Sequence, residues 1–172
     1  MSSLRLLNKT EITSSVSSVN VTDVFSADFD IYCYTITDLS SSSNATTTRT
    51  RFINSSGSVI TSSDYDYAFL NMFSNQSFTE PVSTTADNIT GFVDTTQNDL
   101  SAGVTTWIFN PFNSSTYTFG LSQTMSTQNL RAKKAIGVLH QIASITGFQL
   151  YNTAGDNLDA GTIRTYGLRV DS

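Results

Sequence analysis

The chain has 172 residues, 13% of them charged, and a formal net charge of -5. A chain of this length fits one domain, and its 11 Phe and 7 Tyr can fill a core without disulfides. The acidic balance argues against nucleic acid as a partner. The sequence also has no cluster of cations that could bind phosphates, because the only adjacent cations are Lys133 and Lys134. We interpret that pair as part of a surface strand turn.

Ser and Thr replace Lys and Glu as the main polar residues, at about three residues in ten. Thr is enriched in β-strands while Lys and Glu are depleted there, so this bias favours a β protein. The single cysteine, Cys33, excludes an internal disulfide, and we interpret it as a small buried hydrophobic residue. No apolar run approaches the ~20 residues of a membrane span, and no apolar signal-peptide segment follows Met1–Arg5. We therefore expect a protein that is made and assembled in a cytoplasm and has no membrane partner.

The beginning of the chain predicts a short N-terminal extension ahead of the main domain. Residues 1–18 are expected to form an arm or an edge strand, and residues 19–172 a β-sandwich domain. Strands are predicted in this first half at Val19–Phe25, Asp28–Leu39, Thr46–Asn54 and Tyr65–Phe73. In the turn at 54–58, Gly57 is expected to take a positive φ.

The second half continues the alternation, with turn-rich loops between the strands. Further strands are predicted at Ile89–Asp94, Val104–Phe109 and Ser115–Thr124, with an irregular stretch at Asn75–Asn88 and a loop at Met125–Arg131. The segment Ala132–Ser144 admits a helix, because Ile136, Leu139, His140 and Ala143 share a helical face. Its Val138 and Ile142 and its strand-rich surroundings favour a strand.

The end of the chain predicts a terminal β-hairpin. Ile145–Tyr151 and Gly161–Val170 both alternate, and a turn-rich connector joins them. With this hairpin the chain holds about eight to ten strands, which predicts an all-β fold: an antiparallel, jelly-roll-like β-sandwich.

Catalytic patterns are absent from the sequence, so we do not expect an enzyme or a cofactor. The only histidine, His140, lies in an apolar context and is interpreted as structural, and no Gly-x-Ser-x-Gly motif exposes a serine. Three acidic stretches leave Ca²⁺ binding open as an alternative: Asp28 with Asp30, Asp64 with Asp66, and Asp156–Asp159. Three aromatic residues would suit stacking on sugars if they were exposed, although we expect the last to be buried: Tyr65, Tyr67 and Trp107.

Several stretches resemble small virion structural proteins of marine tailed phages, including cyanophages. They are Arg51–Val59 with Tyr65–Ala68, Trp107–Pro111 with Ser115–Phe119, and Ile145–Gln149 with Gly161–Leu168. The resemblance implies a β-sandwich on the capsid or the tail of a virus particle, often in a symmetric oligomer, assembled in the host cytoplasm.

On this resemblance we expect a capsid decoration protein on the virion surface that acts by protein–protein adhesion, as a homotrimer. Its partner would be the major capsid protein or another virion protein, contacted through Leu4, Leu6, Leu7 and Ile12. The alternative is a tail- or fibre-associated receptor-binding module that contacts host glycans through the loops Ser74–Asp87 and Met125–Arg131. A third possibility is a cellular lectin or polysaccharide hydrolase.

Overall fold

The protein is all-β. The computed structural model describes residues 4–43, 47–94, 96–97, 102–127, 130–153 and 155–168, and these ranges contain no helix. Thirteen strands occur in the described ranges: β1 (Leu4–Ile12), β2 (Ser18–Val21), β3 (Ile31–Ser41), β4 (Thr48–Asn54), β5 (Tyr65–Phe73), β6 (Val82–Ala86), β7 (Ile89–Thr90), β8 (Thr96–Gln97), β9 (Ala102–Phe109), β10 (Thr118–Ser126), β11 (Arg131–Leu139), β12 (Ile145–Asn152) and β13 (Leu158–Leu168). The predicted number of eight to ten was too low, because β7 and β8 have two residues each and leave no alternation to detect, and because β6 lies in the stretch predicted to be irregular.

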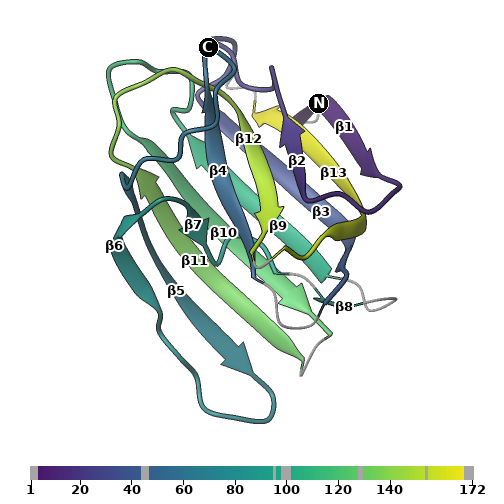
Figure 1. The fold of residues 1–172 in the computed structure, drawn as a ribbon. Helices are drawn as coiled ribbons and strands as arrows, with labels where there is room; N and C mark the ends of the chain where they lie inside the picture. Colours follow the sequence, from purple (N-terminus) through teal and green to yellow (C-terminus); the bar gives the residue numbers. More distant parts are fainter. Residues whose placement is uncertain are drawn as a thin grey trace.

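The strands form two sheets that pack face to face (Figure 1). The larger sheet has nine strands in the order β1-β13-β3-β9-β10-β11-β5-β6, with β8 added to β3 in parallel; every other strand pair is antiparallel. The smaller sheet has four strands in the order β2-β12-β4-β7. The chain crosses between the sheets at every connection from β1 to β5, and again before and after β7 and β12. The result is an antiparallel, jelly-roll-like sandwich.

The core lies between the two sheets and is rich in aromatic rings. Alternate residues of β3, among them Tyr32 and Tyr34, point toward the smaller sheet and are fully buried. The Tyr34 ring stacks on Phe148 of β12 at a centroid distance of 4.5 Å. Burying rings of this size removes a large apolar area from water and so helps to hold the two sheets together.

Two glycines in the larger sheet make room for one aromatic ring of the core. Gly120 of β10 lies opposite Gly137 of β11. A Cβ added to Gly120 would lie 2.4 Å from Phe92, and one added to Gly137 would lie 3.0 Å from the same ring. The Phe92 ring therefore packs directly on the backbone of both strands. Because this inward side of β10 carries small residues, the large side chains of the strand, such as Phe119, point to the opposite face.

The predicted terminal hairpin is wrong. β12 pairs with β2 and β4 in the smaller sheet, whereas β13 pairs with β1 and β3 in the larger one. Both strands exist and both alternate, but the connector between them crosses from one sheet to the other. Alternation separates the two sides of a strand and leaves its pairing partner undefined.

The observed bounds of single strands and loops confirm some of the other predictions and correct the rest. The segment 132–144 is a strand, as favoured, but the strand ends at Leu139. The stretch 75–88 is not wholly irregular, because it contains β6, which pairs with β5. The loop predicted at 125–131 is shorter, since β10 reaches Ser126 and β11 begins at Arg131. Gly57 has the predicted positive φ, at 79°.

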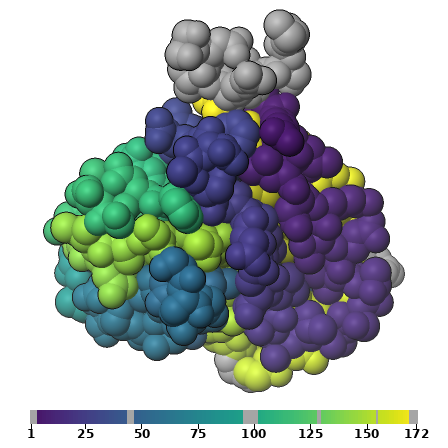
Figure 2. All heavy atoms as spheres, turned by 90° about the horizontal axis from the view of Figure 1, so that it is seen from above, coloured from purple at the N-terminus to yellow at the C-terminus, as the bar shows by residue number. Residues whose placement is uncertain are grey.

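The N-terminal segment is an edge strand for most of its length. β1 pairs with β13 from Leu4 to Ile12, and a bulge at Leu7 interrupts the ladder. Figure 2 shows the N-terminal residues, in purple, next to the C-terminal residues, in yellow. Because β2 already belongs to the smaller sheet and begins at Ser18, residues 4–18 are part of the sandwich.

Candidate binding surface

The larger sheet has one face that no described strand covers, which we call the outer face. The inward side chains of this sheet pack against the smaller sheet, and the alternate side chains point away from it. The burial pattern of β10 shows this division, since its inward residues are buried and the residues between them are half-buried or exposed. Side chains on the outer face are therefore available to contact another molecule.

An apolar row crosses the outer face from strand to strand. Its members lie opposite one another in the registers of six adjacent strands: Leu6, Tyr166, Cys33, Trp107, Leu121 and Ile136. Ile136 is 58% exposed and Leu6 is 52% exposed. A hollow of about 630 Å³ adjoins this row and is lined by Phe109, Phe119, Val138 and Ile136. Contiguous exposed apolar side chains of this kind are typical of interaction surfaces.

Cys33 is buried although it belongs to the outer face. Only 3% of its surface is exposed, because Tyr166 and Trp107 flank it on the two neighbouring strands. Burial raises the pKa of the Cys33 thiol from 9.0 to about 11. The interpretation of Cys33 as a buried structural residue is confirmed.

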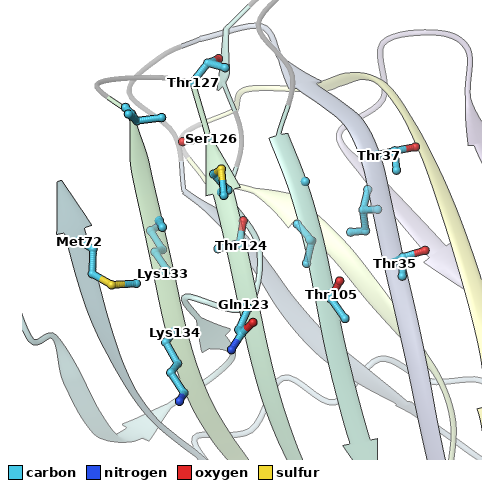
Figure 3. A pocket seen from close by; sticks show the side chains of 16 residues that line it. Thr35, Thr37, Met72, Thr105, Gln123, Thr124, Ser126, Thr127, Lys133 and Lys134 are labelled. Atoms are coloured by element: carbon cyan, nitrogen blue, oxygen red, sulfur yellow. The ribbon is translucent and has the colours of Figure 1, made fainter. Parts of the chain in front are cut away.

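A second row on the outer face consists of hydrogen-bond donors. We call it the donor row, and it follows the registers of five adjacent strands: Arg164, Thr35, Thr105, Gln123 and Lys134. Figure 3 shows its last four members side by side on β3, β9, β10 and β11. One strand beyond Arg164, Lys9 forms an ion pair with Glu11. The hydrogen bond from Lys9, its charge and, more weakly, the charge of Arg164 hold the pKa of Glu11 below its ordinary value.

A groove of about 900 Å³ runs along the donor row from Thr35 to Lys134 (Figure 3), and Arg164 lies beyond its lining residues. Its floor is low on both sides of Met125, because the small residues Gly103 of β9 and Ala132 of β11 lie opposite Met125. A Cβ added to Gly103 would have no atom within 4 Å. Met125 and Met72 border this low part of the floor and lie on either side of Ala132.

Beneath the groove, a buried acid holds two cations inside the sandwich. The Asp94 carboxylate accepts two hydrogen bonds from Arg131, at 2.6 and 2.7 Å, and one from Lys133 Nζ at 3.0 Å. Desolvation lowers the pKa of Lys133, and the charge of Asp94 opposes that shift. The interpretation of Lys133 and Lys134 as a surface turn is therefore wrong. Both residues lie within β11, with Lys133 on the buried side and Lys134 in the groove.

The four residues predicted to bind a partner do not share one surface. Leu4 and Leu6 are exposed on the outer face at the sheet edge. Leu7 is half-buried and packs against the core, since the bulge turns it inward. Ile12 is only 6% exposed and belongs to the core, so its assignment to a partner-binding surface is wrong.

The aromatic residues considered for sugar stacking also lie in different places. Tyr65 is fully buried, where its hydroxyl accepts a hydrogen bond from Phe52 N and donates one to Ile60 O. Tyr67 packs against the core. Trp107 is half-buried on the outer face, in the apolar row.

His140 is more exposed than its apolar neighbours in the sequence indicate. Its imidazole is 45% exposed, lies 3.6 Å from the Asp66 carboxylate and contacts the Tyr117 ring. Within the described ranges, no group of three or more His, Cys, Asp or Glu side chains is placed to hold a metal ion. No helix long and apolar enough to span a membrane occurs there either.

No model of a known protein family matches the chain, and no curated protein matches it. Similar solved structures include the marine PL-14 alginate lyase from Aplysia kurodai, at 7% identity and a TM-score of 0.38 over 86% of this chain and 72% of that one. An alginate lyase from Alteromonas sp. 272 has 9% identity and a TM-score of 0.33 over 95% and 75% of the two chains. The VP2 subviral particle of infectious bursal disease virus has 9% identity and a TM-score of 0.17 over 98% and 42%. At these identities and TM-scores the likenesses carry no argument about function.

Proposed function

We propose that this chain is a structural protein of a virus particle that acts by adhesion and has no catalytic activity. As a decoration protein on the capsid surface, it binds the major capsid protein or another virion protein and works as a homotrimer. The sequence resemblance to phage virion proteins supplies the context. The structural observation that carries the docking step is the edge strand β1, with Leu4 and Leu6 exposed on it.

The β1 edge has two properties of a docking element. Among the described strands it pairs with β13 alone, and an edge strand of this kind can pair with a strand of another chain. Its exposed Leu6 can enter an apolar pocket of the partner, and full burial of a leucine contributes about 1.5–3 kcal/mol. Leu7 and Ile12 hold β1 on the sandwich, since both pack into the core.

The test compares Leu6→Ser with a matched control, Ile142→Ser, because Ile142 is 59% exposed and lies outside β1. Both proteins are added to capsids purified without the protein, and the bound copies are counted by quantitative mass spectrometry. We expect Leu6→Ser to lose occupancy and Ile142→Ser to bind like the unchanged chain. Equal occupancy of the two variants would rule out docking through β1.

A tail- or fibre-associated module that binds host glycans is the second candidate. The groove beside the donor row favours it, because a volume of about 900 Å³ falls within the ~300–1,000 Å³ typical of ligand sites. The two candidates differ in copy number in purified virions. Hundreds of copies per particle support a capsid position, and a handful support the tail.

A further inference from the structure

We infer that the donor row and its groove bind a linear anionic polysaccharide that lies across the strands from β13 to β11. This inference rests on the glycan-binding candidate and is independent of whether the protein sits on the capsid or the tail. The observation behind it is the juxtaposition of two cations, Arg164 and Lys134, with three uncharged polar residues between them in one continuous register.

The charges of the donor row favour an anion. The chain as a whole is acidic, with a net charge of -5, yet both charged members of the donor row are cations. The charged residues that line the groove, among those described, are Lys133 and Lys134. Asp94 neutralises Lys133 inside the sandwich, whereas none of the described residues that line the groove beside Lys134 is acidic. Carboxylate or sulfate groups form charge-assisted hydrogen bonds with such lysine and arginine side chains.

The length of the row selects an extended ligand. Arg164 and Lys134 are four strands apart, which is roughly 19 Å at ~4.8 Å per strand. A small anion cannot contact both, whereas a chain of sugars can. Between the two cations, Thr35, Thr105 and Gln123 offer hydroxyl and amide groups, which match the hydroxyl groups of sugar rings.

The rest of the groove provides the apolar support that a sugar ring needs. Its low floor at Gly103 and Ala132 leaves space above the sheet, and Met125 supplies an apolar side chain beside that space. A mainly apolar lining with a few polar groups at set positions is the usual composition of a ligand site. A nucleic acid fits less well, because its affinity depends on many cations along the backbone and the row has two.

The central experiment fills the groove without disturbing the fold. Gly103→Phe places a ring where a Cβ meets no atom within 4 Å, at a glycine whose φ is not in the left-handed region. Binding of oligogalacturonate, a linear chain of carboxylated sugars, is measured by calorimetry for this variant and for the unchanged chain. We expect the variant to lose binding while its melting temperature stays the same. Unchanged affinity in a correctly folded Gly103→Phe protein would overturn the inference.

Charge variants test the ends of the row separately. We expect Arg164→Gln and Lys134→Gln each to weaken binding about two- to fivefold, the range of an exposed ion pair, and added NaCl to weaken binding further. Arg5→Gln is the matched control, since it removes an exposed cation from the opposite side of β1. A loss in the control equal to that in Lys134→Gln would show a general charge effect and would overturn the site.

A neutral polysaccharide distinguishes the specificity for anionic chains from glycan binding in general. Dextran, a neutral polysaccharide, is expected not to bind. If dextran bound in the groove as well as oligogalacturonate, the anionic specificity would be wrong and the glycan-binding candidate would stand. If neither bound, both would be wrong, and tighter binding of single-stranded DNA would replace the polysaccharide with a nucleic acid.

Discussion

Cys33 and Trp107 lie directly opposite each other on β3 and β9, on the outer face of the larger sheet. Tyr166 lies on the other side of Cys33, in β13. These two large neighbours leave the thiol almost no exposed surface, although no strand of the smaller sheet covers it. The single cysteine can therefore serve as a reporter of the packing within the apolar row.

The first prediction concerns the reactivity of that thiol. Burial raises the pKa of Cys33 to about 11, so at pH 8 the group is the neutral thiol, which is a poor nucleophile. We expect the native protein to react slowly with Ellman's reagent at pH 8, and the rate to rise as the pH approaches 11. Trp107→Ala should speed the reaction by uncovering the sulfur, whereas Trp107→Phe should have a smaller effect. A native thiol that reacts as fast as the thiol in the unfolded chain would contradict the packing.

A second prediction compares two acids that each pair with an arginine. Asp94→Asn leaves the charges of Arg131 and the buried Lys133 without their counterion, and we expect it to lower the free energy of unfolding by about 3–5 kcal/mol. Asp87→Asn breaks the ion pair with Arg51 at a carboxylate that is 43% exposed, and should cost about 1 kcal/mol or less. Urea unfolding of both variants measures the difference. Equal stability of the two proteins would argue against a buried ionic cluster.

A third prediction tests the contact between Phe92 and the strand backbone. Gly120→Ala introduces a methyl group 2.4 Å from the Phe92 ring, and we expect it to cost about 1–3 kcal/mol through overpacking. Gly103→Ala adds the same methyl group to a neighbouring strand, where it meets open space, and should change stability by no more than about 0.5 kcal/mol. Thermal unfolding of the pair gives the answer, and a neutral Gly120→Ala would show that Phe92 does not pack there.

Alternation alone was enough to place most of the longer strands. In Ser115–Thr124 it predicted β10, because large and small residues alternate without interruption. It could not tell which side faces the core, and the inward side turned out to carry Thr118, Gly120 and Ser122. The ring of Phe92, 28 residues before Gly120, fills the space that those small residues leave, and no local pattern records that contact.

The candidate site depends on relationships that a single strand does not contain. The donor row draws its five residues from five strands, and the chain order of those strands differs from their order in the sheet. The terminal hairpin failed for the same reason, since pairing partners depend on the whole topology. Lys133 offered a local signal that was missed: it is in phase with Ala135, Gly137 and Leu139, the buried residues of β11.

The position of β13 sets an order for the assembly of this molecule during synthesis. Its neighbours in the sheet are β1 and β3, which are synthesised well before it. Until β13 has emerged, β1 has no ladder to join and one side of β3 stays open. During that time the apolar side chains and unpaired edges of β1 and β3 are exposed and can aggregate with other polypeptides. We therefore expect slow folding and a need for chaperones at this stage.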